Sequence, residues 1–499
     1  MKTKYIIKSI LLAGLFTCTT SCADWLNVEM EDSIMEKSLF SSNEGFLTAL
    51  NGVYTSMNDT YANTLSMGTI DIMAQYYTVR GSAEHTFYVF GDYKYSESTF
   101  ESTLGTVWTK LYNLIANINL LLEHCDEPDA SIQAKYYPIV KGEALALRAM
   151  MHFDMLRLYG PIYSPSSEET LVMPYQDTSS KDIQPLLSSK VVLSKVIDDL
   201  KAASSLLKSV DPICTDGILN SSVDGNDDNS LRFRQFRLNY YAIQLLLARA
   251  YLWGGDKATA YTVARNILTE TKADGEKPIF NWTKKEDVIK EKYPDRMFSP
   301  EVIFSLYNMK RISLYKSLFN PSVKLASRLT FVGQSIAGTT SKVQTFYDDE
   351  NDVRRTMWDS EISEEETGAE GSLYFKKYAD FEDEGKTIPY RYMIPLMRMS
   401  EVYLIAAECT SDIAEVQGYI NKIRNNRSCA NVEVTLENVQ NIITKEFSRE
   451  VIGEGQLFFY YKRHAMEKIP SGTKADEDFS LNLSNYIWPL PKVETDKRF

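Results

Sequence analysis

The stretch from Asn239 to Leu268 constrains the fold most strongly, because it reads as two helices joined at Gly254-Gly255. Ala248 and Ala250 are small enough to let a neighbouring helix approach the first helix closely. The second helix carries alanines where it must pack back on the first, at Ala258, Ala260 and Ala264. Two such helices cannot bury their apolar faces alone. The pattern therefore predicts stacking on further pairs, as in tetratricopeptide repeats.

Three other pairs of segments show helical periodicity: 44–57 with 104–124, 131–159 with 189–207, and 396–409 with 413–427. Gly160-Pro161 ends the stretch before it, because proline lacks the backbone N–H that a continuing helix needs. A further long helix is predicted over 435–466. These patterns predict a mostly α fold, in which about four tetratricopeptide-like helix pairs form a right-handed superhelical frame.

Two regions interrupt the helical periodicity. Residues 58–102, the excursion, are rich in Tyr, Ser, Thr and Gly. From about 275 to 395, short apolar runs alternate with charged or glycine-rich segments, which predicts an irregular insertion with a few short strands. We therefore predict a single domain over 41–499, with an N-terminal part (41–275), this insertion and a helical C-terminal part (396–499).

The amino-terminal segment has the features of an export signal. Lys2, Lys4 and Lys8 make a basic start, and the apolar stretch over 6–16 is shorter than the roughly 20 residues that span a bilayer. We predict a lipoprotein signal peptide over 1–21, lipid attachment at Cys22 and an extended tether to residue 40. This places the protein outside the cytoplasm. The alternative is an ordinary cleaved signal peptide followed by an incidental cysteine.

Charge and motif content argue against several classes of function. The formal net charge of −13 repels phosphate backbones, so nucleic acid is not expected as a partner. The chain has four histidines and lacks the HExxH, GxSxG, Walker and GxGxxG patterns, so no metal or cofactor is predicted. The acidic and polar segment between about 209 and 230, which includes Asp224, Asp227 and Asp228, lacks the closing glutamate of a calcium-binding EF-hand loop and is predicted to be a solvated loop. A glycosidase-like pair of carboxylates stays open, because such a pair is defined by its separation in space.

The excursion carries a dense group of aromatic residues, with Gln75 and Arg80 among them: Tyr76, Tyr77, Phe87, Tyr88, Tyr93, Tyr95 and Phe100. Aromatic rings stack on the C–H faces of sugars, while neighbouring polar groups bond the hydroxyls. The combination indicates a binding surface for neutral ligands. The alternative is that these rings pack a long loop onto the helices.

Short motifs follow one another in a fixed order: Trp108-x3-Tyr112-x2-Ile115-x3-Asn119, Gly142-Glu143-Ala144 with Leu147-Arg148-Ala149, Arg398 to Glu408, Arg449-Glu450 with Glu454-Gly455, and Trp488-Pro489-Leu490-Pro491. Their order and spacing resemble the SusD/RagB family of outer-membrane nutrient-binding lipoproteins over nearly the whole chain. Two positions depart from the family pattern. Phe447 stands where an arginine is usual, and Tyr460 stands where an aspartate is usual.

The resemblance implies a non-enzymatic, lid-like binding protein, lipid-anchored in the outer membrane and facing the cell exterior. Such a protein caps a SusC-like TonB-dependent transporter and captures oligosaccharides or polysaccharides for import. Peptide capture is the alternative within the family, and a surface glycosidase or a protein-binding scaffold are the alternatives outside it. The motif residues Glu401, Glu408 and Arg424 are expected to bridge helices rather than to touch a ligand.

Ligand sites in the family are built from loops outside the repeats, which here are the excursion and the insertion. The resemblance therefore points to ligand-binding residues in the excursion, at Tyr76, Tyr77, Arg80, Tyr88 and Tyr93. From the insertion we add Trp282 and Tyr315.

Overall fold

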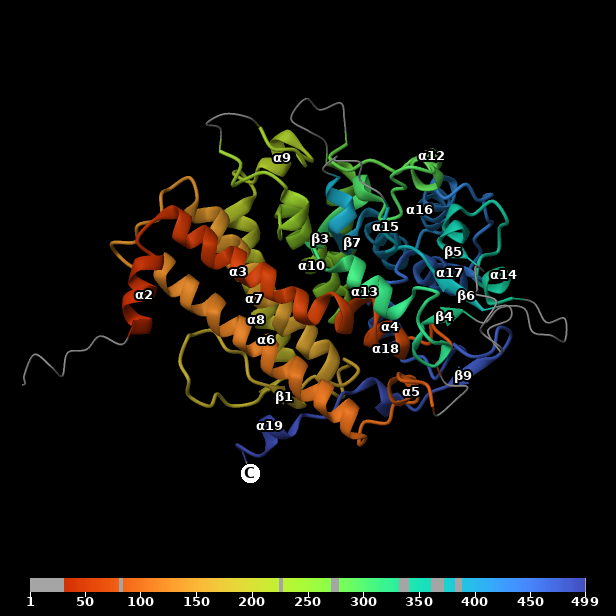
Figure 1. Ribbon diagram of the computed structural model, residues 1–499, viewed down its shortest axis with the longest axis horizontal. Coiled ribbons are helices and arrows are strands. Elements are labelled where there is room, and N and C mark those ends of the chain that lie inside the picture. The colour runs from red at the N-terminus through yellow and green to blue at the C-terminus, as the bar shows by residue number, and fades with distance from the viewer. Residues whose placement is uncertain are drawn as a thin grey trace, which may run out of the picture.

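The computed structural model describes residues 31–79, 84–223, 228–270, 278–331, 341–359, 372–381 and 388–498. The predicted signal peptide, Cys22 and Arg80 lie outside these residues. The described chain is mostly helical with a few short strands, which confirms the predicted fold class (Figure 1). Across these described ranges, no helix combines the length and the apolar character that crossing a membrane requires.

Four pairs of contacting helices form the frame. They are α3 (Asn43–Tyr61) with α6 (Ser98–Cys125), α7 (Tyr137–Tyr159) with α8 (Ser189–Leu207), α10 (Tyr240–Trp253) with α11 (Lys257–Thr269), and α15 (Met399–Cys409) with α16 (Ile413–Asn426). These are the pairs that the periodicity predicts. Contacts also join α6 to α7, α8 to α10 and α11 to α15, so the pairs stack in chain order and cover one another's apolar faces.

Local chemistry fixes where these helices begin and how closely they pack. The side chains of Ser42, Ser188 and Asn239 accept hydrogen bonds from backbone N–H groups in the first turns of α3, α8 and α10. At Gly142 of α7, a Cβ would lie 1.9 Å from Leu207 Cδ1 of α8. The glycine therefore permits the close approach of these two helices.

The insertion contains short strands, as predicted. β3 (Val302–Tyr307) pairs antiparallel with β7 (Met393–Arg398), which leads directly into α15. A second sheet has the order β4 (Thr330–Phe331), β6 (Leu373–Phe375) and β5 (Trp358–Asp359). Two further pairs lie outside the insertion: β1 (Leu171–Met173) with β2 (Leu187–Ser188), and β8 (Lys468–Pro470) with β9 (Asp478–Ser480).

Short helices connect the larger elements. They are α9 (Pro212–Asp216), η3 (Arg234–Phe236), α12 (Lys285–Ile289), η4 (Ser299–Glu301), α13 (Arg311–Leu318), η5 (Leu325–Ser327), α14 (Lys342–Phe346), η6 (Val353–Met357), η7 (Pro389–Tyr392), η8 (Leu483–Tyr486) and α19 (Lys492–Thr495). Most of them lie in or beside the insertion, which explains why the sequence there shows no long helical period.

Three segments differ from the sequence prediction. The excursion, expected to be non-helical, contains the π-helix η2 (Asn63–Met67) and the short helices α4 (Thr69–Met73) and α5 (Tyr88–Gly91). The tether, expected to be extended, contains α2 (Glu31–Leu39). The helix predicted over 435–466 is two helices, α17 (Val439–Glu450) and α18 (Leu457–Arg463). Gly453 and Gly455 separate them with φ angles of 82° and 70°.

The turn Gly453-Glu454-Gly455, here the glycine turn, holds the excursion in place. Asp71 of α4 accepts hydrogen bonds from the backbone N–H groups of Gly453, at 2.6 Å, and Gly455, at 3.1 Å. Asp71 is fully buried, and this burial raises the pKa of its carboxyl. The middle of the excursion is therefore part of the core.

Ion pairs of the motif residues tie the helices of the C-terminal part to one another and to α10. Arg249 of α10 donates to both carboxylate oxygens of Glu401 at 2.6 Å. Glu408 of α15 pairs with Arg463 of α18, and Arg424 of α16 reaches a carboxylate of α17 at 3.5 Å. The prediction that Glu401, Glu408 and Arg424 bridge helices is confirmed.

Candidate functional site

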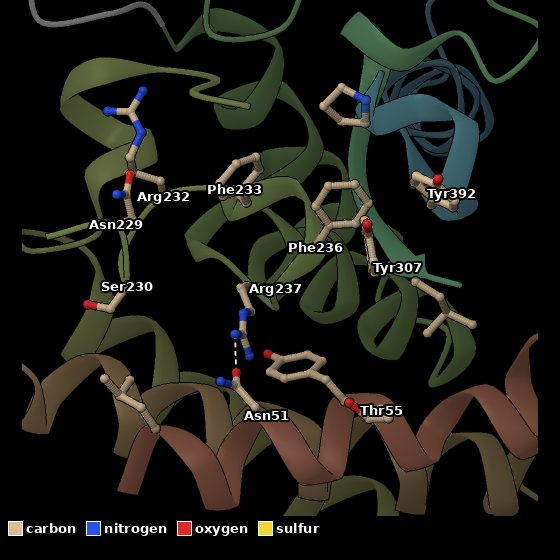
Figure 2. Close-up of a pocket in the computed structure, with 14 residues that line it drawn as sticks. Asn51, Thr55, Asn229, Ser230, Arg232, Phe233, Phe236, Arg237, Tyr307 and Tyr392 are labelled. Carbon is tan, nitrogen blue, oxygen red and sulfur yellow. Dashed lines mark hydrogen bonds between the residues drawn. The ribbon is translucent and has the colours of Figure 1, made fainter. Parts of the chain in front are cut away.

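A groove of about 530 Å³ opens between α3 and the segment that leads into α10 (Figure 2). Helix α3 forms one side, and residues 229–237, the end of β3 and η7 form the other. The lining mixes rings with polar and aliphatic side chains: Tyr54, Phe233, Phe236, Tyr307 and Tyr392; Asn51, Thr55, Asn229, Ser230, Arg232 and Arg237; and Leu47, Leu306 and Pro389.

Buried polar contacts behind the groove hold its two sides at a fixed separation. Arg234 donates to Asp211 and pairs with Glu143, and all three residues are buried. The Tyr54 hydroxyl of α3 donates to the same Glu143 at 2.7 Å and accepts from the backbone N–H of Leu238 at 2.9 Å. One carboxylate therefore links α3 to the segment around η3.

Phe233 turns the chain into η3 in a conformation that bulky residues seldom adopt. Its φ is 57°, in the left-handed region. Its N–H donates to the Leu219 carbonyl at 3.0 Å, and its carbonyl accepts from Phe236 at 2.9 Å. Backbone strain of this kind persists where the surroundings enforce it and is concentrated at functional sites. The turn presents Phe236 to the groove.

Three rings form a continuous wall. Phe236 and Tyr307 meet edge to face, with centroids 5.2 Å apart and planes at 87°. Tyr392 lies on the other side of Tyr307, with a centroid distance of 5.2 Å. Tyr307 is 47% exposed although the five residues of β3 before it are buried, because it is the last residue of the strand and its side chain lies in the groove. Tyr307 is therefore the central accessible ring of the groove.

Arg237 crosses from the aromatic wall toward α3 (Figure 2). Its guanidinium carbon lies 4.6 Å from the centroid of the Tyr54 ring, and Nη2 donates to Asn51 Oδ1. Burial and the nearby Glu143 raise the pKa of Tyr54, which keeps this phenol neutral. The result is a cation held between an aromatic face and an amide.

The described lining consists of groups that can stack on a ligand or form hydrogen bonds with it. It offers rings, amides, hydroxyls and guanidinium groups but no Asp, Glu, His or Cys. Hydrolysis of a glycosidic bond by the usual route needs two carboxyl groups roughly 5–10 Å apart. Over the whole described part of the chain, no group of three or more His, Cys, Asp or Glu is placed to hold a metal ion.

The predicted rings at Tyr76, Tyr77 and Tyr93 are buried. The hydroxyls of Tyr76 and Tyr93 donate to backbone carbonyls in the core. The expectation that these three rings form an exposed platform is wrong, because Asp71 and the glycine turn hold the excursion inside the molecule.

The other predicted residues are scattered. Tyr88 is half-buried, with the Lys94 nitrogen 4.4 Å from its ring centroid, and Tyr315 is buried. Trp282 is half-buried and lines a separate cavity of about 180 Å³ beside Tyr403. Ligand binding by Tyr88 and Trp282 stays a prediction, whereas the buried Tyr315 ring offers no accessible stacking face.

None of the predicted site residues that the structure describes lines the groove. The insertion does contribute to it, through Tyr307, Pro389 and Tyr392 rather than through Trp282 or Tyr315. A sequence signal for the rest of this side of the groove exists in the repeated aromatic and arginine residues of Phe233-Arg234-Gln235-Phe236-Arg237.

Two family models match the chain in succession. One, described as starch-binding associating with outer membrane, matches residues 24–212, and the SusD family model matches residues 219–497. A SusD-like protein of Formosa agariphila is 26% identical over 212 residues, which are 42% of this chain and 39% of that protein. A second SusD-like protein of the same organism is 24% identical over 220 residues, with the same coverage. The matches thus span less than half the length of these curated relatives.

Solved structures share the fold. A SusD superfamily protein from Bacteroides thetaiotaomicron has a TM-score of 0.68 at 20% identity, covering 91% of this chain and 98% of that one. A SusD-like carbohydrate binding protein from Bacteroides vulgatus has a TM-score of 0.65 at 15% identity, with coverage of 91% and 96%. A laminarin-binding SusD-like protein has a TM-score of 0.63 at 15% identity, with coverage of 91% and 98%. At these identities the similarity establishes the fold.

Proposed function

Because the chain belongs to the SusD family, we propose that it binds glycans at the cell surface and passes them to a SusC-like TonB-dependent transporter. In this proposal a lipid on Cys22 anchors the protein in the outer membrane, facing the cell exterior, and the protein catalyses no reaction. The names of two structural neighbours, one carbohydrate-binding and one laminarin-binding, support the ligand class.

The observation that carries the proposal is the aromatic wall of the groove. Tyr307, flanked by Phe236 and Tyr392, gives an accessible ring that can stack on the C–H face of a sugar. Asn51 and Thr55 on the α3 side offer hydrogen bonds to hydroxyls. Such contacts give modest affinity. An anchor beside the transporter compensates by raising the effective concentration of bound glycan there.

A binding screen tests the proposal. The protein starting at Ala23 is titrated with polysaccharides, oligosaccharides and a peptide digest, and each ligand that binds is titrated again with Tyr307→Ala. We expect glycans to bind, and Tyr307→Ala to weaken them about 10-fold or more, since a central stacking ring is lost. Binding of peptides alone, or glycan binding that Tyr307→Ala leaves unchanged, would contradict the proposal.

Two further measurements test catalysis and anchoring. Incubation with each bound glycan should produce no new reducing ends, and sustained turnover would establish a glycosidase instead. In cells that lack the transporter, Cys22→Ala should move the protein from the membrane fraction to the soluble fraction. Retention of this variant in the membrane fraction would refute the lipid anchor.

A further inference from the structure

Arg237 is the central charge of the groove and has no carboxylate partner among the residues that the structure describes. Its Nη2 donates to Asn51, while Nη1 is enclosed beside the Tyr54 ring without a hydrogen bond. The other arginine of the lining, Arg232, donates to the backbone carbonyl and the hydroxyl of Ser221. The described lining therefore holds two cations and no anion.

Three arginines elsewhere in the chain, all of them buried, are paired with a carboxylate. Arg354, Arg398 and Arg427 converge on Glu450, with N–O distances of 2.7 to 2.9 Å. Their charges hold the pKa of Glu450 well below its usual range despite its burial. Removing a charge from water without a counterion is costly, and these arginines avoid that cost by pairing. Among the described residues Arg237 instead has no carboxylate partner, and it lies at an open groove in a chain with a net charge of −13.

A ligand that fills the groove must cover Arg237 and displace its water. A neutral sugar would leave the guanidinium desolvated and without a counterion. A carboxylate or a sulfate would supply the missing counterion and accept a charge-assisted hydrogen bond from the guanidinium. Because Asn51 and Tyr54 already hold Arg237 in position, little side-chain freedom is lost when the anion binds.

We propose that the groove selects glycans that carry an anionic group, a uronic-acid carboxylate or a sulfate ester, and that Arg237 binds this group. The proposal rests on the glycan-binding function proposed above and deepens it by naming the ligand class. Tyr307 stacks on a sugar ring at the aromatic wall, and Arg237 binds the substituent on the α3 side. The chain as a whole is acidic, so the preference arises from contact rather than from long-range attraction.

Matched pairs of glycans test this selectivity by calorimetric titration at one fixed ionic strength. Oligogalacturonides are compared with the same oligosaccharides after reduction of their carboxyl groups, and dextran sulfate oligosaccharides are compared with dextran oligosaccharides. We expect the anionic member of at least one pair to bind about 10- to 100-fold more tightly than its neutral counterpart. The pair that shows the preference distinguishes a carboxylate from a sulfate.

Variants of Arg237 test its role. Arg237→Gln removes the charge and should reduce the preference to within about threefold, whereas Arg237→Lys keeps the charge without the fork and should be intermediate. Arg265→Gln is the matched control, because Arg265 also lies over a tyrosine, Tyr261, at 5.6 Å but outside the groove. Its affinities should equal those of the wild type. Thermal unfolding of each variant establishes that it is folded.

The outcomes separate the selectivity from the glycan-binding function. Equal affinity for both members of every pair, with Tyr307→Ala still weakening binding, overturns the selectivity and leaves the proposed function standing. A preference that persists in Arg237→Gln overturns the role of Arg237. Absence of binding to every member of both pairs and to every glycan of the screen contradicts the proposed function and the selectivity together.

Discussion

The excursion and the groove are both rich in aromatic residues, yet their rings face opposite environments. In the excursion, Tyr76 and Tyr93 turn their hydroxyls onto backbone carbonyls and are buried. In the groove, Tyr307 lies at the end of β3 and leaves nearly half of its surface exposed. The aromatic content of a segment therefore says little about exposure, which depends on how the backbone of that segment is anchored.

The anchors of the excursion are two ionisable side chains that bond to backbone. Asp71 accepts from the glycine turn, and Lys342 donates to the carbonyls of Gln75 and Tyr76 at 3.0 and 2.7 Å. Both side chains are themselves buried. Backbone fixed in this way on the inside of the molecule draws the attached rings inward. The groove rings are instead carried by strand ends and a short turn, where one face remains open.

Disrupting the glycine turn, which holds the excursion, is the change with the largest expected effect on stability. Gly455→Ala would place a Cβ 2.1 Å from the Leu65 carbonyl oxygen and require an alanine at a φ of 70°. We expect the free energy of unfolding to fall by about 3 kcal/mol or more, measured by urea denaturation. Gly418→Ala in α16, whose Cβ meets no atom within 4 Å, should instead stabilise by about 0.5–1 kcal/mol. Similar small effects in both variants would show that the glycine turn does not anchor the excursion.

The next largest expected effect is on the pH dependence of stability, through the buried Lys342 that holds the excursion. Burial lowers the pKa of Lys342 from 10.5 to about 7. Between these values the unfolded chain holds a proton that the folded chain has lost. The free energy of unfolding therefore rises with pH, by up to about 1.4 kcal/mol per pH unit from this group. Lys342→Met should flatten the profile between pH 7 and 10, whereas Lys316→Met, at an exposed site, should not. Identical profiles for the two variants would contradict the role of Lys342.

The smallest expected effect is that of Tyr76→Phe, which removes one hydroxyl from the core. This hydroxyl donates to the Ser448 carbonyl at 2.5 Å, so its loss should lower the free energy of unfolding by about 1 kcal/mol. Glycan affinity should not change, because the ring is buried away from the groove. A loss of glycan affinity without a loss of stability would show that Tyr76 contacts the ligand and would contradict this prediction.

The helical frame could be predicted because its signals are local. Alanine positions and helical periodicity identified all four pairs, and Gly160-Pro161 marked the end of α7. The break between α17 and α18 was missed, because the glycines lie inside an otherwise helical pattern. Their positive φ angles depend on Asp71, which lies 382 residues from Gly453 in sequence.

The two departures from the family pattern turn out to be in contact. Phe447 and Tyr460 stack with ring centroids 4.5 Å apart and planes at 24°. Two positions where the family usually has an arginine and an aspartate are thus both aromatic in this chain, and a stacking contact joins α17 to α18 there. A linear motif shows each departure separately, and the structure shows that they belong together.

The site could be predicted only in part, because ring exposure is a tertiary property. The insertion was expected to contribute, and it supplies Tyr307 and Tyr392 to the groove. Nothing in the sequence around Tyr76 and Tyr77 shows that a buried carboxylate and a buried lysine hold their backbone inside. Nor does the segment before Arg237 reveal that its guanidinium meets α3, nearly two hundred residues earlier in the chain.

The most direct test of where the ligand binds compares the loss of one accessible ring in the groove with the loss of one accessible ring in the excursion. Tyr307→Ala and Tyr88→Ala, in the protein starting at Ala23, are titrated with the glycan that binds most tightly in the screen. We predict a loss of about 10-fold or more for Tyr307→Ala and a change within about twofold for Tyr88→Ala. Unchanged affinity in Tyr307→Ala together with lost affinity in Tyr88→Ala would place the ligand on the excursion and contradict the groove as the binding site.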